Sequence, residues 1–262
     1  MNYHLKAESI STYKKNTERN VFEIIYRVNE LNRELQNSVI YDKDLKMYFE
    51  NSKSLHIYSY EIDVQFVKLD LCRRLSKGTE LHRKLFYRYD WLKVSQTGDG
   101  SNLTVLNKNE LNERWKKLRK YITDSGYRGN SLTEYLEKID KEFDKNIAVY
   151  PSLNQYLYFG LFFPPIHENY IENRNTKRIV EFSPFENEKF EESVKSKSLT
   201  DGVIKYEVTG NTLPAESKTD IKEYTGEITK PIGEILPTRV NINTSIEMNN
   251  ISSQWNFQLT RV

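Results

Sequence analysis

The sequence predicts an α+β fold, in which an N-terminal helical bundle (residues 1–148) precedes a mainly antiparallel β domain (149–262) with one short inserted helix. Three observations predict this fold. Apolar residues of the first half recur at helical spacing, whereas those of the last third alternate with polar residues, as in strands. Between them lies the most apolar and aromatic run of the chain, residues 149–166. We therefore expect two domains that meet at this run.

The strongest helical pattern of the first half covers residues 17–37. Its apolar residues fall mostly three or four positions apart and form one stripe: Val21, Ile24, Ile25, Val28, Leu31 and Leu35. We expect further helices at 42–51, 80–94, 109–122 and 131–143. Ser131 and Glu134 have the spacing of a capping box, which indicates the start of the last of these helices.

Residues 55–75 fit two structures. The apolar residues Tyr60, Ile62, Val64 and Phe66 alternate with charged or polar ones, which is typical of a strand. The length of the segment and the run LDLCRRL that ends it favour a long buried helix. We interpret the segment as a helix and keep the strand as the alternative.

The central run, residues 149–166, is expected to be a buried strand, or a strand and a turn, because each large apolar side chain removed from water contributes about 1.5–3 kcal/mol. Its aromatic residues are candidates for a core shared by the two halves or for an interface with another chain. They are Tyr156, Tyr158, Phe159, Phe162 and Phe163. The alternative is an exposed docking strand that a partner covers.

Alternating patterns in the last third predict strands at 178–182, 203–209, 224–228, 240–248 and 255–259. The last two are joined by a short polar linker, which is typical of an antiparallel hairpin. Ser183, Pro184 and Glu186 stand at the cap, first-turn and capping-box positions of a helix start. We therefore expect the inserted helix at 183–194.

Composition limits the class of protein. The net charge is only +2, but residues 1–150 hold 27 Lys and Arg against 22 Asp and Glu, so the basic excess lies in the first half. The single cysteine, Cys72, excludes an internal disulfide and favours a reducing compartment. No stretch approaches the roughly 20 apolar residues that cross a bilayer, and the first residues lack the apolar core of a signal peptide. We expect a cytoplasmic protein without a membrane span.

No catalytic, metal or nucleotide motif is found in the sequence. The four histidines have no metal-ligand spacing, and Gly98–Gly100 lacks the lysine and the further glycine of phosphate-binding loops. We therefore expect no cofactor and no metal, and assign no catalytic residue. An enzyme whose site is assembled from scattered polar residues is a third interpretation, and His167, Glu168 and Arg178 beside the central run are its candidates.

Basic residues cluster around 73–93 and 114–120, with aromatic residues between them. If the charges share one surface, they could contact phosphates. The candidate nucleic-acid contacts are Arg114, Lys116, Lys117 and Lys120. Neighbouring Asp and Glu residues favour the simpler interpretation, a solvated helix face.

The sequence thus favours a non-enzymatic structural or interaction subunit of a larger intracellular assembly, such as a phage-type or secretion-type machine. Its 18 Tyr, 12 Phe and 3 Trp favour self-association or binding to other protein subunits, because aromatic residues are enriched at interfaces. A nucleic-acid-associated protein that uses the basic helices is the alternative.

Overall fold

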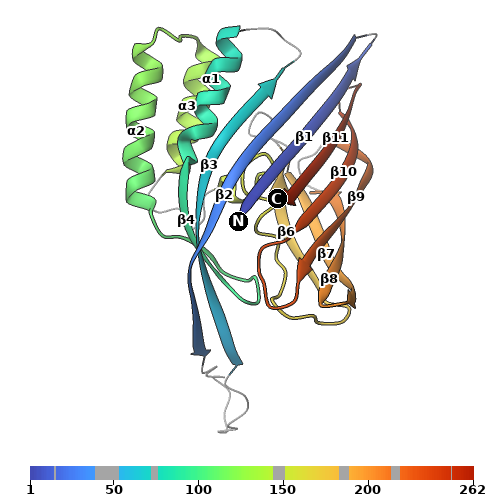
Figure 1. The fold of residues 1–262 in the computed structure, drawn as a ribbon. Coiled ribbons are helices and arrows are strands. Elements are labelled where there is room, and N and C mark those ends of the chain that lie inside the picture. Colours follow the sequence, from blue (N-terminus) through green and yellow to red (C-terminus); the bar gives the residue numbers. More distant parts are fainter. Residues whose placement is uncertain are drawn as a thin grey trace, which may run out of the picture.

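The computed structural model describes residues 1–14, 16–38, 53–71, 76–143, 151–182, 189–213, 219–248 and 250–262. These residues form one 11-stranded antiparallel sheet with three α-helices beside it (Figure 1). The strands are β1 (Asn2–Tyr13), β2 (Asn16–Ser38), β3 (Lys53–Asp70), β4 (Trp91–Thr97), β5 (Leu103–Val105), β6 (Asn175–Glu181), β7 (Lys189–Thr200), β8 (Val203–Thr212), β9 (Thr219–Pro231), β10 (Arg239–Met248) and β11 (Ile251–Arg261). The helices are α1 (Ser76–Phe86), α2 (Lys108–Asp124) and α3 (Asn130–Glu142), with the short 3₁₀-helices η1 (Tyr87–Tyr89) and η2 (Pro151–Asn154).

The chain starts and finishes in the middle of the sheet. The strand order is β5-β4-β3-β2-β1-β11-β10-β9-β8-β7-β6, so the chain runs outward from β1 to β5 and returns inward from β6 to β11. The helices α2 and α3 and the central run connect the two outer strands. Strands β1 and β11 pair along eleven positions, from Tyr3 with Arg261 to Tyr13 with Ile251, and join both halves in one sheet. The division into folding units at residue 148 stays a prediction.

The predicted N-terminal helical bundle is wrong, because the described residues of the first half form five strands of the sheet and only three short helices. Residues 17–37 belong to β2, whose buried side chains alternate: Phe22, Ile24, Tyr26 and Val28 are buried and the residues between them are not. This two-residue period is that of a strand. The i, i+3, i+4 spacing arose because Val21 and Ile25, on the outer face, are also apolar.

The helix predicted at 55–75 is also wrong as far as Asp70, because this part is strand β3, in which Tyr60 and Ile62 are buried and alternate with polar residues. Residues 72–75 lie outside the described residues. The helix predicted at 80–94 is divided among α1, η1 and β4. Helices α2 and α3 lie where the sequence predicts them. The helix predicted at 42–51 lies outside the described residues.

The β half is largely as predicted, including the β10–β11 hairpin. The inserted helix is wrong where it can be compared, because residues 189–194 belong to strand β7. Its proposed start at Ser183 and Pro184 lies outside the described residues. Phe190 and Val194 are buried at even spacing along β7 and face the same side of the sheet.

The described part of the central run is not a strand. It begins with η2 and continues in turns through Phe162, and its side chains fill the inner face of the curved sheet. The Phe162 ring lies 5.0 Å from the rings of Tyr3 on β1 and Tyr26 on β2, both edge-on. The Tyr26 hydroxyl donates a hydrogen bond to the Tyr158 carbonyl at 3.0 Å. The run therefore forms the hydrophobic core on the inner face of the sheet.

A buried arginine attaches the helices to this core. Arg88 of η1 lies 4.3 Å from the centre of the Tyr158 ring and 3.4 Å from a carboxylate oxygen of Glu142 on α3. A buried charge is tolerated only with partners, and these two groups supply them. In Figure 1 the three helices stand side by side next to β3 and β4.

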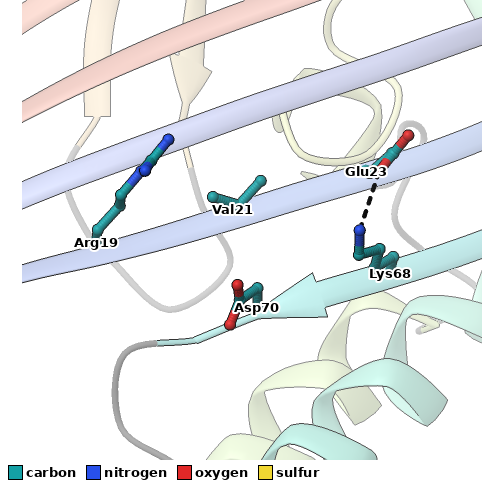
Figure 2. A pocket seen from close by; sticks show the side chains of 5 residues that line it. All are labelled: Arg19, Val21, Glu23, Lys68 and Asp70. Atoms are coloured by element: carbon teal, nitrogen blue, oxygen red, sulfur yellow. Dashed lines mark ion pairs between the residues drawn. The ribbon is translucent and has the colours of Figure 1, made fainter.

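The outer face of the sheet is charged. Figure 2 shows a shallow hollow there, where Arg19, Val21 and Glu23 of β2 face Lys68 and Asp70 of β3. Lys68 and Glu23 form an ion pair at 3.8 Å. Charges of both signs alternate on this surface, which is typical of a solvated sheet face.

We expect Phe162→Ala to destabilise the whole sheet, because Phe162 contacts strand β1, strand β2 and its own segment. Loss of a buried Phe side chain costs about 3–5 kcal/mol. The thermal midpoint should fall by roughly 10 °C in one transition, measured by circular dichroism of helix and strand signals. The matched control is Phe66→Ala on β3, where the ring is 44% exposed and the change should be small. Separate transitions for helix and strand signals would contradict a single core.

Candidate functional site

Strands β2 and β3 extend beyond the rest of the sheet as an arm. Strand β1 pairs with β2 only as far as Arg27, and β4 pairs with β3 only from Ile57. The arm consists of residues 29–38 and 53–56. No described strand pairs with the outer edge of its β2 part, and its last four residue pairs are a two-stranded ribbon (Figure 1). Such a ribbon is marginally stable in water by itself.

The arm carries exposed apolar side chains. Every residue from 29 to 35 is exposed, on both faces of the strand, and Leu31 and Leu35 are 48% and 60% exposed. Leu31 is the extra residue of a β-bulge, since Glu30 pairs with Tyr60 and Asn32 with Ser59. A bulge bends and twists a strand locally. The arm therefore leaves the sheet at a fixed bend and presents two leucines.

A polar network anchors the base of the arm to the body. The Glu168 carboxylate, from the loop after the central run, accepts a hydrogen bond from the Tyr58 hydroxyl at 2.6 Å and from His56 Nδ1 at 2.9 Å. The same hydroxyl lies 3.0 Å from the carbonyl oxygen of Gly233. Tyr58 and His56 are neighbours on one face of β3. One carboxylate thus holds the strand at the point where it becomes the arm.

Hydrogen bonds from the Lys230 side chain to backbone carbonyl oxygens fix the loop that carries Glu168. The buried ammonium of Lys230 donates hydrogen bonds to the carbonyl oxygens of Glu168, Pro231 and Glu234 at 2.8–3.1 Å. Burial lowers the pKa of Lys230 to about 8, so the group remains charged at pH 7. A Cβ on Gly98 would lie 2.8 Å from the Glu168 carboxylate, so any larger residue there would displace this carboxylate.

The electrostatics of the anchor favour an ionised Glu168. Burial alone would raise the pKa of its carboxyl, but the hydrogen bonds from Tyr58 and His56 outweigh burial and hold the pKa below its usual value. Burial and the neighbouring Glu168 raise the pKa of Tyr58, so its hydroxyl keeps the proton that it donates. The network is therefore complete at neutral pH.

The three candidates of the enzyme interpretation are not brought together. Arg178 forms an ion pair with the buried Glu192 at 2.6 Å, whereas Glu168 belongs to the anchor. His167 Nδ1 accepts a hydrogen bond from the backbone of Asn169. A carboxylate that orients a histidine is also the arrangement of a general base. Among the described residues, however, the only side-chain hydrogen bonds of His56 are those to Glu168, so no nucleophile is aligned with it.

The basic candidates lie on or near the exposed face of α2. Arg114 is paired with Asp90 and stacks on the Trp91 ring, and Lys116 is paired with Glu113 at 2.7 Å. Lys117 and Lys120 are exposed. Of the other cluster, Arg73 and Arg74 lie outside the described residues. Nucleic-acid binding stays a prediction, for which a titration at physiological salt is the test.

The aromatic candidates Tyr156, Tyr158, Phe159, Phe162 and Phe163 are all buried under the sheet. Their role in coupling the two halves stays a prediction. Sequence reasoning missed His56, Tyr58 and Lys230, although the alternation in residues 55–75 would have put His56 and Tyr58 on one face of a strand.

Within the described ranges, no three His, Cys, Asp or Glu side chains converge to hold a metal ion. In the same part of the chain, no helix combines the length and the apolar character needed to cross a membrane. No family model and no curated protein matches this chain.

We expect Glu168→Gln to lower the free energy of unfolding at pH 7 by about 1–3 kcal/mol, because hydrogen bonds to a charged group are lost. The pKa of Glu168 is lower in the folded state, so its stabilisation is present above the unfolded pKa, near 4.5, and is lost as the pH falls through the folded pKa. Urea unfolding between pH 7 and 3 should therefore show a shallower loss of stability for the variant.

The matched control is Glu172→Gln, an exposed carboxyl of the same loop, which should follow the wild-type curve. If Glu168→Gln and the wild type lose stability in parallel at acid pH, the anchor does not depend on the carboxylate.

Proposed function

We propose that the protein is a non-enzymatic assembly subunit that self-associates through its arm. The observation that carries the proposal is the open outer edge of β2 from Asn29 to Ser38. Natural sheets protect such edges with charged side chains, proline, bulges or a covering element, because an open edge pairs readily with another strand. No described element covers this stretch, which contains no Lys and no Pro. Its protection is limited to the bulge at Leu31 and the charges of Glu30, Arg33 and Glu34.

A second copy of the chain fits this edge. The open edge starts beyond Arg27, which pairs with Asn2 at the N-terminal end of β1. A strand added there would lie in line with β1 and continue the sheet. Two β2 strands that pair antiparallel about a two-fold axis at Arg33 would place Leu31 of each copy opposite Leu35 of the other. Both leucines would then be covered by the pairing. Addition of a strand to an edge supplies affinity through backbone hydrogen bonds, and such apolar pairs supply register.

The anchor supports the same proposal. A segment that binds a partner gains affinity from being held in one orientation, because ordering a mobile segment on association costs free energy. The buried Glu168, bonded to both Tyr58 and His56, sets the direction in which the arm leaves the body.

We expect wild-type protein at about 100 μM to have twice the chain mass of 31.1 kDa by light scattering. The double variant Leu31→Thr, Leu35→Thr should be a folded monomer, because threonine suits a strand but removes the apolar contact. Ile179→Thr on β6 is the matched control, since Ile179 is 48% exposed, as Leu31 is. It should leave the mass unchanged.

Cross-linking tests the register. In a Cys72→Ser background, Arg33→Cys lies on the proposed two-fold axis and should form a disulfide-linked dimer on mild oxidation, whereas Ile179→Cys should not. A wild-type chain that is monomeric at 100 μM, or a dimer that the leucine variant leaves intact, would refute assembly through the arm.

A further inference from the structure

A second candidate site lies where the two edges of the sheet approach each other. A hollow of about 400 Å³ is bordered on one side by β4, β5 and the turn between them, and on the other by β6 and the loop before it. Phe163 and Pro165 of the central run also line it. This volume is within the range of small-molecule sites, about 300–1,000 Å³. The arm takes no part in the hollow, so an inference about it goes beyond the proposed assembly.

Gln96 contributes a buried acceptor to the hollow. Along β4 the inward-facing residues are Leu92, Val94 and Gln96, so the third inward position is polar where the first two are apolar. Gln96 is 2% exposed, and its Oε1 has no hydrogen-bond partner. Buried polar groups are almost always hydrogen-bonded, so this unpartnered oxygen is a candidate acceptor for a donor group of a ligand in the hollow.

Of the four charged residues that line the hollow, Arg174 and Asp99 form no ion pair among the described residues, whereas Lys177 and Arg178 are paired with Glu191 and Glu192. Arg174 is fixed through its backbone, whose carbonyl accepts a hydrogen bond from Ser196 N at 2.9 Å, and its guanidinium Nη2 donates to the Asp99 carbonyl at 3.2 Å. No ion pair among the described residues includes Arg174, so most of its donors are available. Asp99 Oδ1 accepts hydrogen bonds from Thr97 and Ser101, whereas Oδ2 accepts none from the described residues.

The turn that carries Asp99 requires a glycine, because it lies close against the backbone of the central run. Gly100 has a φ of +74°, and a Cβ there would lie 2.5 Å from the Ile166 carbonyl oxygen. The turn therefore rests directly on the end of the central run. The apolar part of the lining comes from Leu103, Phe163 and Pro165. Its other members are the polar residues Ser101, Asn154 and Thr176, and the cations Lys177 and Arg178, which are paired with Glu191 and Glu192.

We propose that this hollow binds a free α-amino acid with an apolar side chain. The carboxylate of the ligand pairs with Arg174, because guanidinium and carboxylate match in geometry and charge. The ammonium group donates to Asp99 Oδ2 and to Gln96 Oε1. The side chain lies against Phe163 and Leu103. A cation, an anion, an unpartnered acceptor and an apolar wall are together the complement of a zwitterion with an apolar body.

The test is calorimetric titration of the full chain with L-phenylalanine and L-leucine. At least one should bind with a Kd below about 1 mM. N-acetyl-L-phenylalanine lacks the ammonium group and L-phenylalanine amide lacks the carboxylate, so each should bind at least tenfold more weakly. Similar binding of the N-acetyl compound would indicate a site for acids in general and would overturn the amino-acid assignment, as would no binding of either amino acid at 5 mM.

Variants locate the site. Arg174→Gln should weaken binding at least tenfold, and Gln96→Leu at least threefold, while Lys195→Gln, an exposed cation of β7 outside the hollow, should leave the Kd unchanged. Arg174→Lys keeps the charge and serves where Arg174→Gln folds poorly. Its Kd should lie between those of the wild type and Gln96→Leu. Amino-acid binding that survives both Arg174→Gln and Gln96→Leu in folded protein would refute this location.

Discussion

The inner face of the curved sheet needs an apolar filling, and the rest of the structure depends on how that filling is supplied. The chain supplies it from one segment, residues 153–166, whose side chains are almost all buried. The Phe162 ring meets β1 and β2, and Tyr156 meets Phe257 of β11 at 5.0 Å. Strands from both halves therefore bury their inner faces against the same residues. Removal of such a segment would expose apolar surface on both halves.

The same segment determines where the polar sites can form. Its end passes directly into the loop with Glu168, which anchors β3, and its Phe163 and Pro165 line the hollow between the sheet edges. Both sites are thus positioned by a segment whose side chains are almost all buried. Polar groups held on a packed support keep their geometry, which binding sites require.

The sequence predicted the strands with a clear two-residue period, β10 and β11 above all, and the helices α2 and α3, whose apolar residues follow a single stripe. It failed for β2, because Val21 and Ile25 add apolar residues on the outer face and imitate a helical period. It also failed for β3, where length was weighed above the alternation of Tyr60 and Ile62. Pairing with neighbouring strands determined the structure of both segments, since β2 lies between β1 and β3, and β3 lies between β2 and β4.

Of the anchor, only Glu168 could be singled out from the sequence. Its partners His56 and Tyr58 lie 112 and 110 residues away, and no local pattern connects residues at that separation. The hollow was equally hidden, because Gln96 and Arg174 come together only when the two sheet edges meet. The sequence pattern shows periodicity along one segment, whereas these sites depend on which segments become neighbours.

The pairing of β1 with β11 has a consequence for synthesis on the ribosome. Tyr3 is paired with Arg261, so β1 emerges long before β11, and its second edge stays uncovered until β11 has been made. During that time β1 and β2 form an edge open to any other nascent chain. Contacts this distant in sequence also form slowly, because a large loop must close before they are gained. We therefore expect the sheet to be completed only after β11 has emerged, with chaperone dependence greatest while the β1 edge is open.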